Sequence, residues 1–138
     1  MKNIRTHSRI DNSLSGFPEI VKDGYAVVRL KTDDRMVADD TGLIHGGFIF
    51  SAADYAAMLS LASHRDVWNF SRVCTGGHCP EPVVKGDEVI FEARLDREEG
   101  KKKIVSVVGM KEEEEVFRGS FICVVPKNHV LKKDEIKK

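Results

Sequence analysis

The sequence predicts an α+β domain in which one antiparallel sheet of about five strands wraps around a single central helix. From residue 48 to residue 62 no Pro or Gly interrupts a run rich in Ala and Leu, and we expect a helix over residues 46–63. Side chains about one turn apart line up along a helix, and two such lines on different sides of this predicted helix are both apolar. This pattern is typical of a buried helix. The segments that follow it alternate between apolar and polar residues and are separated by short loops. A single sheet buries a single helix best by curling around it.

The first strand is expected at residues 24–31, after an N-terminal arm, residues 1–23, that we expect to be partly irregular. Every second residue of that strand is apolar and predicted to face inward: Ala26, Val28 and Leu30. The clearest later strand spans residues 88–96, where the inward positions are Val89, Phe91, Ala93 and Leu95.

Two more strands are expected at residues 104–110 and 116–125. Gly100 is expected to supply a positive φ in the hairpin loop before them, and the four glutamates of residues 112–115 are expected to form a solvated loop. The Lys-rich residues 127–138 are predicted to be a flexible tail. At 138 residues the chain is long enough for a single core but not for two, so the whole chain is predicted to be one domain.

Composition excludes several classes of partner. The 22 basic and 22 acidic side chains cancel, so the sequence has no nucleic-acid footprint. The first fifteen residues are polar and charged, without the apolar core of a signal peptide, and we expect a cytoplasmic protein. The three cysteines, Cys74, Cys79 and Cys123, lack zinc-ribbon spacing, so we expect reduced thiols; His78 beside Cys79 is the only hint of a metal cluster.

Apolar positions on the outer side of the predicted sheet, such as Val27 and Ile90, would stay partly uncovered in one chain, as would one stripe of the helix. Pairing of two chains would cover them. We therefore expect a homodimer or a homotetramer.

Asp54 is the one acidic residue between residues 42 and 62. A carboxylate within an apolar helix is costly unless it serves a function or accepts hydrogen bonds from a neighbouring strand, and the residues alone leave both interpretations open. A membrane span is disfavoured by this Asp, by the paired glycines and by the abundance of Ala and Ser.

The stretch His45-Gly-Gly-Phe-Ile-Phe-Ser-Ala-Ala-Asp54 resembles the His-Gly-Gly…Phe-Ser-Leu-Ala-Asp motif of the PaaI-type acyl-CoA thioesterases, which have the hotdog fold. The Pro-Val-Val-Lys-Gly-Asp run of residues 82–87 is similar to a turn common in that family, and a weaker likeness spans residues 24–126. The resemblance implies hydrolysis of an acyl-CoA without a metal or redox cofactor.

By this resemblance Asp54 would be the general base or nucleophile, and the Gly46 N–H would be the oxyanion donor, supplied by the other subunit. His45 would either contact the thioester or fix the loop that enters the helix, and we favour the orienting role. The candidates for substrate contact are Gly47, Phe50 and Met58, which share the helical stripe of Asp54, and Asp39.

Two departures from the family pattern are visible. Asp39 stands where the family usually has Asn, and it either brings a second negative charge to the site or points to solvent. The Cys74–Pro80 segment replaces an apolar run, and its two glycines indicate a bulge, a close approach of ligand, or an irregular edge.

Two other functions remain open. Asp40 and His45 have the Asp-x4-His spacing of hotdog enoyl-CoA hydratases, but the Asn-Pro usual within it is absent and Asp54 would be unexplained. A non-catalytic acyl-CoA-binding module, with a structural Asp54, is the second alternative.

Overall fold

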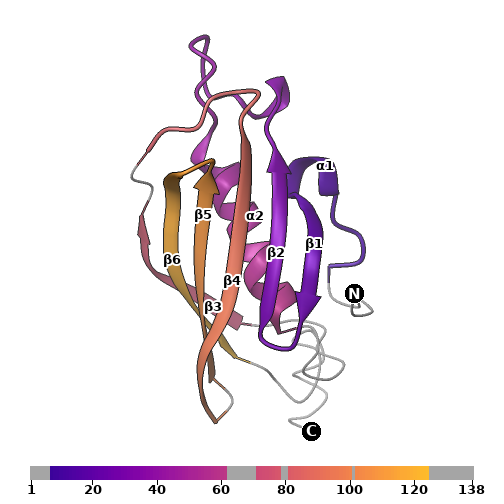
Figure 1. Ribbon diagram of the computed structural model, residues 1–138, viewed down its shortest axis with the longest axis vertical. Coiled ribbons are helices and arrows are strands. Elements are labelled where there is room, and N and C mark those ends of the chain that lie inside the picture. Colours follow the sequence, from indigo (N-terminus) through magenta and orange to yellow (C-terminus); the bar gives the residue numbers. More distant parts are fainter. Residues whose placement is uncertain (1–6, 62–70, 79–80, 101, 125–138) are drawn as a thin grey trace, which may run out of the picture.

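The computed structural model describes residues 7–61, 71–78, 81–100 and 102–124 of the chain, with backbone only for 71–78. Its elements in order are α1 (Asn12–Ser15), β1 (Phe17–Lys22), β2 (Tyr25–Lys31), the 3₁₀ turn η1 (Asp34–Met36), α2 (Gly46–Ser60), β3 (Ser71–His78), β4 (Glu88–Glu99), β5 (Lys102–Lys111) and β6 (Glu114–Val124). The strands form one six-stranded antiparallel sheet in the order β1-β2-β4-β5-β6-β3, with α2 behind it in Figure 1. The predicted α+β architecture is confirmed, with one strand more than expected.

The core lies between α2 and the inner face of the sheet. The inward positions predicted for β2 and β4 are buried, apart from the half-buried Leu95, and they alternate with more exposed residues as the two-residue repeat of a strand requires. On α2 every residue from Ala52 to Ser60 is buried, because the sheet covers one side of the helix and other segments cover the rest. The helix ends at Ser60 with Leu61 as its C-cap, and the predicted residues 62 and 63 lie outside the described residues.

The strand β1 lies within the N-terminal arm and was not predicted as a separate strand. It pairs with β2 along an edge of the sheet through a turn at Gly24, whose φ of 73° suits glycine. Pro18 is tolerated there because an edge strand does not need every N–H, and the register shifts between Pro18 and Ile20. Only Val21 of its six residues is fully buried, so no alternation marks the strand in the sequence.

Glycines 76 and 77 lie at an irregularity, as expected. They belong to β3, the other edge strand, whose register with β6 shifts between Thr75 and His78. Cys79 and Pro80, the side chains of Cys74 and His78, and the tail of residues 127–138 lie outside the described residues, so those predictions stay predictions.

The loops between β4 and β5 and between β5 and β6 are both shorter than predicted. β4 continues to Glu99, and Gly100 has the expected positive φ, 65°. Between β5 and β6 only Glu112 and Glu113 form the turn; Glu114 and Glu115 belong to β6, which corrects the expected four-residue loop. Glu112 has a φ of 54°, a left-handed conformation that a non-glycine residue adopts in such a short turn.

The outer face of the sheet is less open than expected. Val27 is only 7% exposed in the single chain, which corrects the prediction for this residue, whereas Ile90 is half-buried. No helix among the described residues has the length and apolarity needed to cross a membrane.

Gly109→Ala should destabilise the fold by about 1–3 kcal/mol, because the inner face of β5 has no room for a methyl group there. The added Cβ would lie 2.9 Å from Phe91 Cε1 and 3.2 Å from Phe117 Cβ. Urea unfolding measures the loss. The matched control is Gly46→Ala, whose Cβ would meet nothing within 4 Å; it should change stability by no more than about 0.5 kcal/mol. Equal effects of the two substitutions would contradict this packing argument.

Candidate functional site

The N-terminus of α2 is held between two segments that are distant in the sequence. The His45 N–H donates to the Met36 carbonyl over 2.8 Å, and the Ile44 N–H donates to the Val83 carbonyl over 2.8 Å. The first bond ties the helix to η1, and the second ties it to the connection that leads into β4. These bonds fix where α2 begins.

The family-like turn at residues 82–87 is the support on the second side. The Asp87 carboxylate accepts the Val84 N–H over 2.9 Å and closes the turn, while the Lys85 N–H donates to the Gly42 carbonyl over 2.8 Å. Thr32, which directly follows β2, donates its hydroxyl to the Asp87 carbonyl over 2.7 Å. The turn therefore braces the loop that enters α2, at the upper end of the sheet in Figure 1.

His45 is the N-cap of α2. Its Nδ1 accepts the Gly47 N–H over 2.8 Å, which satisfies one of the unpaired donors at the start of a helix. In the neutral ring the proton is then on Nε2. Gly47 permits this contact, because a Cβ there would lie 2.9 Å from Nδ1. The geometry supports the orienting role favoured for His45.

Gly46 has a different environment from its neighbour. It is exposed, a Cβ would meet nothing within 4 Å, and its N–H has no acceptor among the described residues. The positive end of the helix dipole lies at this N–H. An oxygen that carries developing negative charge could therefore bind here without displacing a protein group.

Asp54 lies two turns further along α2 and is 9% exposed. Eight residues separate it from Gly46, about 12 Å along the helix axis. A thioester carbonyl cannot contact both groups of the same chain. The structure of one chain thus leaves these two predicted site residues apart.

Phe50 is on the open part of the Asp54 stripe, one turn before Asp54. It is 43% exposed, and its ring lies 5.6 Å from the ring of Phe121 on β6. Met58, one turn after Asp54, is only 1% exposed and belongs to the core, so it is not accessible to a ligand in this chain. Of the two, only Phe50 is exposed at the surface of this chain.

Asp39 and Asp40, in the loop that precedes α2, are both exposed. The Asp39 carboxylate accepts hydrogen bonds from the hydroxyl and the N–H of Thr41, and these bonds lower the pKa of Asp39. It is thus used to shape the loop tip. Asp40 follows at the same tip, while His45 Nδ1 is occupied by Gly47, an arrangement that does not favour the hydratase pair.

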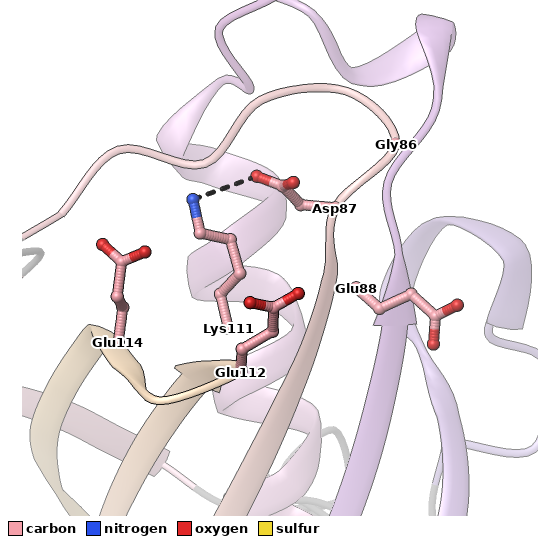
Figure 2. A pocket seen from close by; sticks show the side chains of 6 residues that line it. All are labelled: Gly86, Asp87, Glu88, Lys111, Glu112 and Glu114. Carbon is pink, nitrogen blue, oxygen red and sulfur yellow. Dashed lines mark ion pairs between the residues drawn. The ribbon is translucent and has the colours of Figure 1, made fainter.

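A polar cleft of about 460 Å³ lies beside the turn at residues 82–87 (Figure 2). It is lined by Gly86, Asp87, Glu88, Lys111, Glu112 and Glu114. Lys111 pairs with Asp87 over 3.3 Å and donates to the Pro82 carbonyl, so its charge is partly balanced. The excess of carboxylates makes the cleft a poor site for the phosphates of CoA, and the predicted site residues do not line it.

The sequence interpretation missed the N-terminal contacts to α2. Ser15 and Ser51 share a hydrogen bond, and Asn12 donates to the Tyr55 hydroxyl. Asp11, which caps α1 through Ser13, was an available helix-start signal. No group of three or more His, Cys, Asp or Glu residues that could hold a metal occurs in the described part of the chain.

No family model matches the chain. Among curated proteins it is 50% identical over 124 residues to methylthioribose-1-phosphate isomerase from Aquifex aeolicus, with 88% of this chain and 26% of that protein covered. It is 30% identical over 115 residues to the transcription factor FapR from Caldanaerobacter subterraneus, with 83% of this chain and 54% of that protein covered. The chain thus spans about a quarter and about half of these two relatives.

Solved structures match over nearly their whole length. Protein PH1136 from Pyrococcus horikoshii is 41% identical with a TM-score of 0.87, covering 94% of this chain and 97% of that one. Cj0977, a sigma28-regulated virulence protein from Campylobacter jejuni, is 34% identical with a TM-score of 0.80, covering 92% and 95%.

Two solved structures with lower sequence identity are informative about the fold only. The N33D mutant of the phenylacetic acid degradation protein PaaI from Thermus thermophilus is 20% identical with a TM-score of 0.71, covering 82% of this chain and 96% of that one. Smu.793 from Streptococcus mutans, bound to acetyl CoA, is 19% identical with a TM-score of 0.73, covering 86% and 94%. The predicted hotdog fold is confirmed. The chain belongs to the family of PH1136 and Cj0977.

Proposed function

We propose that the protein hydrolyses an acyl-CoA to the free acid and CoA, with Asp54 as base or nucleophile. The observation that carries the proposal is a nearly buried carboxylate on a helix whose N-terminal Gly46 N–H is exposed and without an acceptor among the described residues. A carboxylate and an unpaired N–H are the two groups that thioester hydrolysis needs. The acetyl CoA bound to the Streptococcus mutans protein of the same fold supports CoA as the thiol.

In the general-base form of the reaction, the thioester oxygen accepts the Gly46 N–H and Asp54 takes a proton from water. The resulting hydroxide adds to the carbonyl carbon, and the negative charge that develops on the oxygen faces the helix N-terminus. The tetrahedral intermediate then collapses, the C–S bond breaks, and the thiolate takes the proton from Asp54. In the nucleophilic form the Asp54 carboxylate adds to the carbonyl carbon, the C–S bond breaks and CoA leaves as the thiolate, which gives a mixed anhydride. Water then hydrolyses the anhydride to the free acid and the Asp54 carboxylate, and the proton released goes to the thiolate.

The two groups would come from different chains, because about 12 Å separates them on one helix. Phe50 is the exposed side chain next to Asp54 on the same stripe, so it would contact the acyl group or the pantetheine arm. His45 would act through the helix start, by keeping the Gly47 N–H occupied and leaving the Gly46 N–H available.

A second candidate is an acyl-CoA-binding module without turnover. The observation in its favour is that both curated relatives carry the matching segment inside longer proteins, one of them a transcription factor. Binding of an acyl-CoA with no release of thiol would support this candidate over the hydrolase.

We expect a homodimer, or a tetramer built from such dimers, because one chain leaves the site incomplete. Light scattering at low micromolar concentration should detect no species with the mass of a single chain. A folded monomer that still releases thiol would contradict the shared site.

Asp54→Asn should lower kcat by roughly 10²–10⁴, because the amide keeps the shape of the side chain but cannot accept the proton or attack the carbonyl. Binding of a non-hydrolysable acyl-CoA analogue should change little, and stability should fall by no more than about 1–2 kcal/mol. Free-thiol release across a panel of acyl-CoA substrates measures the rate. A variant that hydrolyses its best substrate within threefold of the parent rate would remove Asp54 from the mechanism.

His45→Asn should retain most of the activity, since the Asn side-chain oxygen can accept the Gly47 N–H as an N-cap. His45→Ala cannot, and it should cost about 0.5–2 kcal/mol of stability together with a lower kcat. Thermal unfolding and thiol release on the same samples provide the comparison. If Asn is as damaging to kcat as Ala while restoring stability, then the imidazole itself contacts the substrate.

A further inference from the structure

The segment of residues 7–16, here called the N-terminal strap, lies against the middle of α2. Ser15 Oγ and Ser51 Oγ share a hydrogen bond of 3.0 Å, and Asn12 Nδ2 donates to the Tyr55 hydroxyl over 3.3 Å. Tyr55 is buried, and the His7 ring lies 5.6 Å from its ring. Ser51 and Tyr55 are one helical turn apart, so the two bonds hold one stripe of the helix.

The strap is also joined to the sheet. It continues through Gly16 into β1, and a Cβ on Gly16 would clash with Val28 Cγ1, which shows how closely the backbone approaches β2. Arg35 of η1 donates to the Ser13 carbonyl over 3.4 Å. Ile10 and Leu14 pack against the core. The strap therefore links α2 to the β1–β2 edge rather than only covering it.

The helix is thus fastened at three levels. At its start the His45 N–H donates to Met36, and at its end the Ser60 carbonyl accepts the Gly24 N–H over 3.0 Å. Between these levels, the strap bonds flank Asp54, since Ser51 precedes it by three residues and Tyr55 follows it directly. Both lie roughly 60–100° around the helix from Asp54.

Position matters more for Asp54 than for its apolar neighbours. A carboxylate that must meet an oxyanion donor from another chain has to be held to a fraction of an ångström, and a small displacement can lower the rate many-fold. Asn12 Nδ2 also donates to the Gly16 carbonyl over 2.8 Å, which fixes the orientation of its amide. Burial raises the pKa of Tyr55, so its hydroxyl keeps its proton at neutral pH.

We infer that Asn12 and Tyr55, with the Ser15–Ser51 pair, are positioning residues that set the place of Asp54 for thioester hydrolysis. This inference rests on the proposed function. The strap does not touch the reacting atoms; it acts by holding the helical turn that bears the carboxylate.

The test is a double-mutant cycle in the full chain with Tyr55→Phe and Asn12→Ala. Tyr55→Phe removes only the hydroxyl, because Asn12 keeps its bond to Gly16. Each single variant should lower kcat roughly threefold to tenfold with KM little changed, and the double variant should lose no more than the worse single one. Ser51→Ala, which breaks the second bond, should have a similar effect on kcat.

Tyr25→Phe is the matched control. It removes the other tyrosine hydroxyl, which donates to Glu92 over 2.7 Å on the outer face of the sheet, and kcat should stay within twofold of the parent. Hydrogen exchange of the Ser15 and Gly16 amides should be faster in Tyr55→Phe than in the parent and unchanged in Tyr25→Phe.

Unchanged exchange, or faster exchange with unchanged kcat, would overturn the positioning role while leaving the hydrolase proposal intact. Additive losses in the double variant would also overturn it. Absence of turnover in the parent would instead show failure of the proposed function, and the positioning role would fall with it.

Discussion

The structure depends on covering α2 on every side. A helix that is apolar all round loses stability wherever water reaches it, and a single sheet can cover only one side. The inner face of β2, β4 and β5 supplies that side, and on another side the N-terminal strap covers Ser51 and Tyr55. Asp54, at 9% exposed, is the acidic residue within this buried stretch of the helix.

The same enclosure limits where a substrate could approach. The helix is buried from Ala52 onward, so access is left at its first turn and at Phe50. The loop at residues 38–43 and the turn at residues 82–87 frame this end. Asp39 accepts a hydrogen bond from Thr41, Asp87 accepts the Val84 N–H, and Lys85 forms an ion pair with Asp34 of η1. A thioester would thus arrive at the positive end of the helix dipole rather than at a strongly charged surface.

The sequence predicts well the parts of the fold whose pattern is local. β2, β4 and α2 each have enough residues for their periodicity to show, and the buried positions follow from it. β1 has six residues with only Val21 fully buried, so its pairing with β2 is a tertiary effect that alternation cannot reveal. Helical spacing places Met58 on the same stripe as Asp54, but it does not show whether Met58 is exposed. Its burial depends on which other segments of the chain pack over it. The separation of Gly46 and Asp54 does follow from helix geometry, whereas the proposed meeting of each with a group of a second chain cannot be read from the pattern of one chain.

The paired glycines at the start of α2 are constrained by different neighbours. Gly47 lies against the imidazole of its own chain, so a larger residue there would displace His45 from its capping contact and lower the stability of the fold. Gly46 faces open space, and a larger residue would be opposed only when a substrate or a second chain occupies that space. Substitutions at the two positions should therefore have different consequences. Those at residue 47 would lower the abundance of the protein. Those at residue 46 would leave well-folded protein and would accumulate wherever the activity is dispensable.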